Sequence, residues 1–385
     1  MLKKLIALIK NYDGINDKFA LAKIVSEKFG CTRDRAIYYT DYFAIRFIQA
    51  KVEASQVSNT VLSLSALQKF DNKPVIVCIC AKNENFLLLA NTTFVKKLSH
   101  SSMNLRIDNI VGSFNAPDII RSWGGISNIP ENFEELFALH QNYSFEENLS
   151  RIVETTNNIV PTGLKFDVTL DGRMNNILQS PERANRFIAS PDYADLLDDL
   201  IVRTNACKNE ILVAACIENV RVRGTIIEYL IAGESDEVRQ QLITALEACS
   251  SIPRLISRDA LGDYSKTYPN FNTETDIKTK ILILTSTPKG YNLDKMLEFL
   301  SCSDSVFMIF FIGIDFANSA IKTKLISMFQ SELLDNTVFQ EHWAGRNSRG
   351  VSQFRGEAIK RIILEGQGNI DIPKAKAFIN KIIEM

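Results

Sequence analysis

The clearest alternation of hydrophobic and polar positions lies in residues 261–284, LGDYSKTYPNFNTETDIKTKILIL. Successive side chains of a strand point to opposite faces, and the end of this stretch follows that period of two. One face would carry Thr275, Ile277, Thr279 and Ile281, and the other would carry Asp276, Lys278 and Lys280. Pro269 and its Asn neighbours predict a turn, and the resulting hairpin would bring Asp263 back beside Asp276.

The segment after this hairpin alternates between strand-like and helix-like patterns. Strands are expected over residues 281–285, 306–315 and 337–340, and helices over residues 294–300 and 317–334. Residues 306–314 are apolar throughout, as in a central strand that is covered on both faces. We therefore predict an α/β (α+β) fold in which helices flank a mixed central β-sheet.

The first 55 residues show helical spacing of apolar positions and predict an N-terminal helical region. Helices are expected at the start of the chain, over residues 17–29, and from the N-cap candidate Thr32 through Phe47. The tight turn at Gly30 is compatible with a helix-turn-helix that reads DNA. A helical bundle that packs on the main domain, or that forms a dimer, explains the same pattern.

Residues 56–128 are expected to form a smaller region of strands and loops. Strands are predicted over residues 75–80 and 86–89, and a long polar segment follows them. Its side chains suit phosphates and base edges, and the candidates for DNA contact are His100, Ser101, Ser102, Asn104 and Arg106. An ordered surface loop whose hydroxyls bond its own backbone would have the same composition.

Helices are predicted to dominate residues 130–245, and one of them precedes the hairpin. Over residues 224–231 the helical spacing directs Ile227 and Leu230 inward and places Glu228 just upstream of Asp263. In the hairpin itself, Asp276 and Lys278 would stand together in a cleft. A carboxylate and an ammonium so placed can hold a divalent cation and a polarised water beside it.

The order of charged residues in this hairpin resembles the PD-(D/E)xK signature of type II restriction endonucleases. Asp263 comes first, and after a spacer it is followed by Asp276-x-Lys278. The chain departs from that signature in having Gly262 before the first acid and Asp rather than Glu at residue 276. The resemblance implies a restriction-endonuclease-like core within a catalytic domain of residues 129–385. It also implies that an acid on the preceding helix supports the site, and Glu228 matches that position, with Glu218 as a competitor.

The resemblance further implies a Mg²⁺-dependent endonuclease that hydrolyses phosphodiester bonds of double-stranded DNA at a short specific sequence. Asp263 and Asp276 would bind the metal, and Lys278 would orient or deprotonate the attacking water. Glu228 would assist from the helix. A homodimer would suit a symmetric site, and a cognate DNA methyltransferase would belong to the same system in the cytoplasm.

A second group of candidates for DNA contact lies in residues 342–356, HWAGRNSRGVSQFRG. Arginine offers paired donors to guanine or phosphate, and Asn or Gln can do the same for adenine. The candidates here are Arg346, Asn347, Ser348, Arg349 and Gln353. A solvated loop would be the simpler explanation of the same residues.

The composition argues against several classes of site but does not choose among the functions considered above. Of 385 residues, 46% are hydrophobic and 23% charged, as in a globular protein, and the net charge of −1 gives no overall basic signature. Seven Cys without a CxxC pair and three scattered His argue against a zinc site. No Gly-rich phosphate loop is visible, and residues 306–314 are too few to span a bilayer. The alternatives are a non-catalytic helix-turn-helix DNA-binding regulator and a protein-interaction protein.

Overall fold

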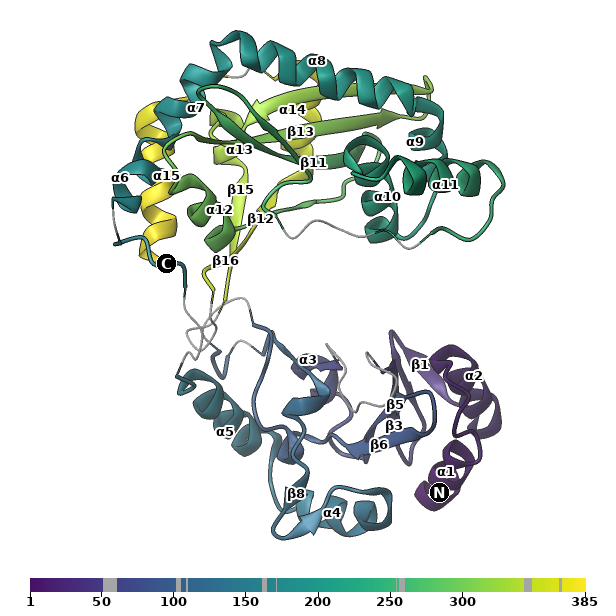
Figure 1. Ribbon diagram of the computed structural model, residues 1–385. Coiled ribbons are helices and arrows are strands. Elements are labelled where there is room, and N and C mark those ends of the chain that lie inside the picture. The colour runs from purple at the N-terminus through teal and green to yellow at the C-terminus, as the bar shows by residue number, and fades with distance from the viewer. Residues whose placement is uncertain are drawn as a thin grey trace. The chain divides into compact units, whose positions relative to one another are not determined.

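The computed structural model describes residues 1–50, 61–101, 105–108, 110–160, 165–170, 172–253, 255, 260–342, 348–366 and 369–385. The chain forms two compact units, which Figure 1 shows. One consists of Met1–Thr162 with His342–Arg346, and the other of Gly163–Glu341 with Asn347–Met385. We call them the N-terminal unit and the C-terminal unit.

The N-terminal unit is built on a five-stranded sheet in the order β1-β2-β3-β5-β6. Its strands are β1 (Thr32–Asp34), β2 (Ile37–Tyr39), β3 (Ala44–Gln49), β5 (Val75–Cys80) and β6 (Asn85–Leu89). Helices α1 (Leu2–Lys10) and α2 (Lys18–Phe29) precede the sheet, and α2 contacts β3. Asp17 caps α2 by accepting hydrogen bonds from Phe19 N and Ala20 N, as expected of an N-cap residue.

The predicted third helix over residues 32–47 is wrong, because this segment forms β1, β2 and most of β3. Ile37, Tyr38 and Tyr39 are β-branched or aromatic residues that favour strands. β3 is held in the sheet by parallel pairing with β5, from Ala44 opposite Val75 onward. Without a second helix after Gly30, residues 1–50 do not form the helix-turn-helix that was one of the two explanations of the sequence pattern.

The rest of the N-terminal unit packs on the same sheet. Its elements are β4 (Leu62–Ser63), α3 (Leu64–Gln68), η1 (Thr92–Phe94), β7 (Ser113–Phe114), η2 (Ala116–Asp118), β8 (Ser122–Trp123), β9 (Ile126–Ser127), η3 (Pro130–Asn132), α4 (Phe133–His140) and α5 (Phe145–Asn157). Helix α4 contacts β6, and α5 contacts η1. The unit therefore continues across residues 55 and 128, where the sequence suggested boundaries.

The C-terminal unit contains a four-stranded mixed sheet in the order β10-β11-β13-β14. Its strands are β10 (Tyr264–Thr267), β11 (Asn272–Ile281), β13 (Ser305–Asp315) and β14 (Ala320–Ser327). β11 pairs antiparallel with β10 and parallel with β13, and α12 (Leu293–Leu300) lies between β11 and β13 in sequence. The predicted mixed α/β class, with helices against a central sheet, is confirmed.

Helices cover this sheet, and a second sheet adjoins it (Figure 1). The helices before the hairpin are α6 (Arg173–Leu178), α7 (Ser180–Ile188), α8 (Pro191–Ala206), α9 (Lys208–Ala215), α10 (Val220–Ala232) and α11 (Asp236–Glu247). After β14 come α13 (Ser331–Asp335), α14 (Gly356–Glu365) and α15 (Ile372–Glu384). A three-stranded sheet has the order β12-β16-β15, from β12 (Lys289–Asn292), β16 (Gly350–Phe354) and β15 (Thr337–Glu341). α10 contacts β11, while α7 and α14 contact β13.

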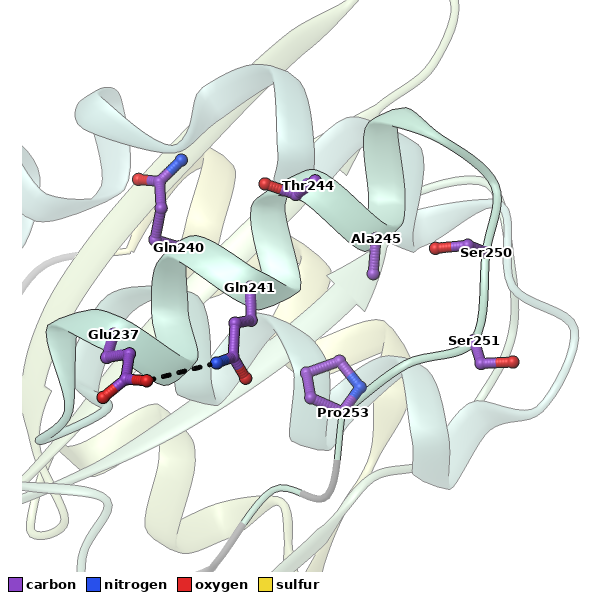
Figure 2. Close-up of a pocket in the computed structure, with 8 residues that line it drawn as sticks. All are labelled: Glu237, Gln240, Gln241, Thr244, Ala245, Ser250, Ser251 and Pro253. Atoms are coloured by element: carbon purple, nitrogen blue, oxygen red, sulfur yellow. Dashed lines mark hydrogen bonds between the residues drawn. The ribbon is translucent and has the colours of Figure 1, made fainter.

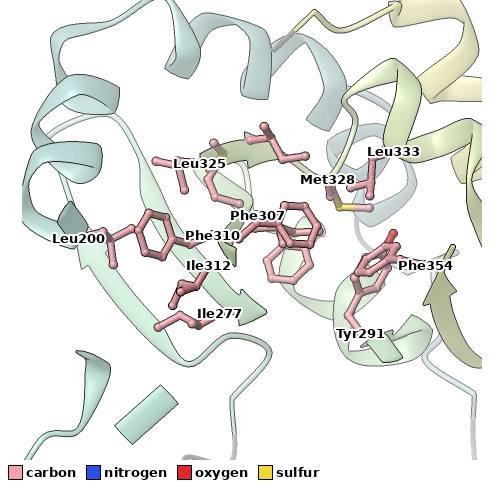
Figure 3. Close-up of a cluster of buried hydrophobic side chains, with 14 of the residues drawn as sticks. Leu200, Ile277, Tyr291, Phe307, Phe310, Ile312, Leu325, Met328, Leu333 and Phe354 are labelled. Carbon is pink, nitrogen blue, oxygen red and sulfur yellow. The ribbon is translucent and has the colours of Figure 1, made fainter. Parts of the chain in front are cut away.

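β13 forms the centre of the C-terminal core. Every residue of β13 is buried except the partly exposed Asp315, as the continuous apolar run predicted. Figure 3 shows Phe310 and Ile312 beside Ile277 of β11. This apolar layer fixes β11 in place and leaves the opposite face of that strand for its polar side chains.

Three sequence-based elements of this unit need correction. Of the helix expected over residues 317–334, only the end from Ser331 is helical, in α13. Residues 320–327 form β14, in which Ile321, Thr323 and Leu325 alternate with lysines and pair antiparallel with β13. β11 ends at Ile281, so no strand extends to residue 285. The loop expected over residues 342–356 contains β16.

Candidate active site

The β10–β11 hairpin brings Asp263 to Asp276, as the sequence predicted. The Asp263 backbone N–H donates to Thr275 O at 2.9 Å, and Asp263 Oδ2 accepts from the Ile277 backbone N–H at 2.8 Å. Gly262 explains the departure from the Pro of the signature. A Cβ at residue 262 would lie 2.8 Å from backbone atoms of Thr275, which is too close for any side chain at this crossing.

Asp276 and Lys278 form a largely buried ion pair on one face of β11. Lys278 Nζ lies 2.7 Å from Asp276 Oδ1, and the Asp276 side chain is only 7% exposed. The second carboxylate oxygen, Asp276 Oδ2, is buried and has no hydrogen-bond partner among the described residues. A buried carboxylate oxygen without a partner is costly, so this atom is open to a ligand from outside the chain.

Glu228 faces this pair from α10, which packs against β11. Burial is the main cause that raises the pKa of Glu228 to about 8, and the charges of Asp263 and Asp276 raise it further, against the opposing effect of Lys278. The Glu228 carboxylate therefore shares one electrostatic site with the hairpin. Glu218, the competing candidate, is exposed and precedes the N-cap of α10, Asn219.

The carboxylates of this site disfavour one another's ionisation. Burial raises the pKa of Asp276 to about 7, with Lys278 opposing the change and Asp263 adding to it. Burial lowers the pKa of Lys278, but attraction to Asp276, Asp263 and Glu228 outweighs burial, so the pKa of Lys278 is raised overall. At neutral pH Lys278 is an ammonium, and a further positive charge would relieve the repulsion among the acids.

These residues fit a hard divalent cation held largely by water. Among the described residues, no group of three or more His, Cys, Asp or Glu is placed to hold a metal ion. Magnesium, however, is usually held by one or two carboxylates and retains several waters. Asp263 and Asp276 would supply those carboxylates.

The sequence placed Lys280 on the same face, but its side chain does not line the cleft. Lys280 is almost fully buried, and its Nζ donates to Leu284 O at 2.5 Å and to Ser286 O at 2.8 Å. These bonds close the turn that follows β11. Lys280 therefore stabilises the backbone beside the site and is not a further cation within it.

The candidates for DNA contact in the N-terminal unit differ from one another in how exposed they are. His100 is paired with Ser113 as an isolated bridge, and both His100 and Ser101 are half-buried. Arg106 is exposed, and its guanidinium donates to both carboxylate oxygens of Asp108, at 2.8 and 2.7 Å. Ser102 and Asn104 lie outside the described residues. All the contacts described for these residues are within the chain, so their binding to DNA stays a prediction.

Arg349 forms bonds within the fold, and its predicted contact with DNA stays a prediction. Its side chain is 7% exposed, and Nη1 donates to Asp294 Oδ1 at 2.6 Å and to Phe166 O at 3.0 Å. Gln353 lies within β16 and donates to Thr287 O. Ser348 is half-buried, while Arg346 and Asn347 lie outside the described residues.

We expect Arg349→Ala to destabilise the protein, because it leaves the Asp294 carboxylate buried without its cation. Removing one partner of a buried ion pair costs about 3 kcal/mol or more. Urea unfolding followed by circular dichroism measures the loss, and the exposed Arg355→Ala in the same segment is the control. A stable Arg349→Ala protein that fails only in binding DNA would favour the predicted DNA contact over this structural role.

A pocket of about 650 Å³ lies away from these residues, along α11 and the segment after it. Figure 2 shows Glu237, Gln241 and Thr244 on the helix, with Ser250 and Pro253 opposite them. None of the predicted site residues lines it. The site around Asp276 is defined by buried charge, and this pocket carries no comparable chemistry.

No family model, curated protein or solved structure matches this chain. Among the described residues, none of the helices is long and apolar enough to cross a membrane. A function for this protein therefore has to be inferred from the chemistry of the hairpin and α10. Sequence reasoning singled out Asp263, Asp276, Lys278 and Glu228, but it gave no signal for Tyr291, a buried tyrosine that packs on Phe307 of β13.

Proposed function

We propose that this protein is a Mg²⁺-dependent endonuclease of the type II restriction class, which hydrolyses phosphodiester bonds of double-stranded DNA. The observation that carries the proposal is the buried Asp276–Lys278 pair, with Asp263 and Glu228 converging on it. A surface ion pair would need no such arrangement, because exposed acids and lysines pair without strong pKa displacement.

Each residue of the site has a definite part in this reaction. Asp263 and Asp276 hold the cation, which when bound acidifies water and neutralises charge at the scissile phosphate. Lys278, whose raised pKa keeps it protonated, orients the attacking water and stabilises negative charge on the phosphate oxygens. Of its two predicted roles, orientation therefore fits better than deprotonation.

Glu228 supports the site from the helix. Its pKa of about 8 lies close to neutral pH, where a carboxylate can take up or release a proton readily. In the cation-bound site the added positive charge favours its ionised form. Glu228 then completes an acidic patch of three carboxylates against one ammonium.

The fold is compatible with this proposal through its order of elements. Helix α10 and then α11 precede the antiparallel β10–β11 hairpin, and the β11 strand continues into a mixed sheet through its parallel neighbour β13. Glu228 on the helix thus faces the acids of the hairpin. A restriction-endonuclease-like core, a homodimer, cytoplasmic action and a partner DNA methyltransferase are further parts of the proposal.

The regulator hypothesis has lost its structural basis, because residues 32–49 are mainly strands and not a recognition helix. A non-catalytic regulator would also have no use for the buried charges around Asp276. No observation on the described residues favours it over the nuclease.

Incubation of the purified protein with unmethylated phage DNA and Mg²⁺ tests the proposal. We expect discrete fragments on a gel, because a site-specific enzyme cuts every molecule at the same positions. EDTA should stop the reaction, and fresh Mg²⁺ should restore it. Intact DNA after incubation with Mg²⁺ or Mn²⁺, for a folded protein and several phage genomes, would contradict the proposal.

A further inference from the structure

Tyr291 places a buried side chain on the same side of the central sheet as Asp276. On β13, Ile309 is the register partner of Asp276, and Phe307 two residues earlier points to that same face. The Tyr291 ring packs edge-on against Phe307, with ring centroids 5.3 Å apart. In Figure 3, Tyr291 lies beside Phe354, which also belongs to this layer.

The Tyr291 hydroxyl and the Asp276 carboxylate each have one unpartnered buried oxygen. Neither Tyr291 Oη nor Asp276 Oδ2 has a hydrogen-bond partner among the described residues. The neighbouring Ser352 hydroxyl bonds the Tyr291 backbone, accepting from Tyr291 N at 2.9 Å and donating to Tyr291 O at 3.3 Å. An unpaired buried polar atom costs about 1–3 kcal/mol, so two such atoms on one face call for a shared partner.

We propose that Tyr291 is a positioning residue for Asp276, through one water molecule held between Tyr291 Oη and Asp276 Oδ2. That water accepts from the phenol and donates to the carboxylate, and so satisfies both atoms. Lys278 already fixes Asp276 Oδ1 at 2.7 Å, so the water fixes the orientation of the other oxygen. Burial raises the pKa of the Tyr291 phenol, the Ser352 side chain opposes this change, and the charge of Asp276 adds a smaller upward effect.

The consequence for the proposed function is that Tyr291 orients a metal ligand without touching the metal. Groups that hydrogen-bond to a metal ligand set its orientation, and their loss commonly weakens metal binding about 10- to 100-fold. This part of the inference rests on the proposed nuclease, in which Asp276 binds Mg²⁺. The hydrogen-bonded link itself does not depend on that activity.

A double-mutant cycle tests the link in the absence of metal. Tyr291→Phe should lower the melting temperature in the wild-type background, and by less than half as much when Asp276→Ala is also present. The control is Tyr193→Phe, whose hydroxyl on α8 donates to Leu325 O at 2.8 Å and makes no contact with the site. Its effect should be the same in both backgrounds. Additive effects for Tyr291→Phe would overturn the link.

Calorimetric titration with Mg²⁺ tests the consequence and needs only the single variants. We expect the dissociation constant to rise about 10-fold in Tyr291→Phe and to stay unchanged in Tyr193→Phe. An unchanged constant in Tyr291→Phe would overturn the positioning role while leaving the proposed function intact. Coupling in the cycle, with no Mg²⁺ binding by the wild-type protein, would instead support the link and contradict the nuclease.

Discussion

Asp276→Asn should abolish DNA cleavage while the protein stays folded and still binds DNA. A bound metal contributes several kcal/mol of transition-state stabilisation, and each ~1.4 kcal/mol is a factor of ten in rate. We therefore expect the cleavage rate to fall by about 10³-fold or more. Asn keeps the shape of Asp, and it removes a charge that burial already disfavours. Gel assays under single-turnover conditions measure the rate.

The matched control for this variant is Asp195 of α8, which pairs with the same hairpin. Asp195→Asn removes an exposed carboxylate of α8 that pairs with Lys266 of β10 at 2.7 Å, away from the converging acids. It should cleave DNA at the wild-type rate. Asp263→Asn and Lys278→Met should resemble Asp276→Asn. Cleavage at an undiminished rate by Asp276→Asn or Lys278→Met would remove this hairpin from the active site.

The candidate site was predictable because its residues are close together in the sequence. The period-two alternation of β11 puts Asp276 and Lys278 on one face, and a short turn returns Asp263 to them. Glu228 was suggested by the resemblance, which implies an acid on a helix before the hairpin, and the helical spacing of α10 supplied its position. Such local periodicities are the part of structure that a single sequence encodes most directly.

The elements that failed depend on the strands that pair with them. β3 is a strand because it pairs with β5, and β14 is a strand because it pairs with β13. Their apolar positions also fit a helix over short windows, and the sequence does not say which strand lies alongside. Tertiary pairing therefore decided the conformation against the local pattern.

The same limit explains why the contacts of Arg349 and Tyr291 were not predicted. Arg349 stands in a segment rich in Gly and polar residues, which suggests an exposed loop, but its partner Asp294 is 55 positions earlier. Tyr291 joins the site through Phe307 of β13, and no motif marks it. Burial of a polar side chain follows from the packed fold and cannot be seen in composition.

The stability of the metal-free protein should fall as the pH rises from about 4 to about 8. Asp276 has a folded-state pKa of about 7, against about 3.9 in an unfolded chain. Between these two pKa values the folded protein binds more protons than the unfolded one. The free energy of unfolding is therefore highest at low pH and falls as the pH rises through the folded-state pKa. Glu228, at about 8, acts in the same direction.

The loss of stability between about pH 4 and about pH 8 is large enough to measure, and Mg²⁺ should reverse it. A tenfold change in proton affinity equals about 1.4 kcal/mol, so Asp276 alone contributes a loss on the order of 4 kcal/mol. The raised pKa of Lys278 adds nothing in this range, because its charge is constant below pH ~10.

Urea unfolding at about pH 5 and about pH 8, with EDTA or with saturating Mg²⁺, separates protonation from metal binding. A cation competes with protons for the same carboxylates, so Mg²⁺ should stabilise the protein strongly at the higher pH and little at the lower one. In Asp276→Asn both the pH dependence and the Mg²⁺ effect should shrink together. If Mg²⁺ stabilises the wild-type protein equally at both pH values, or not at all, these carboxylates do not form its binding site.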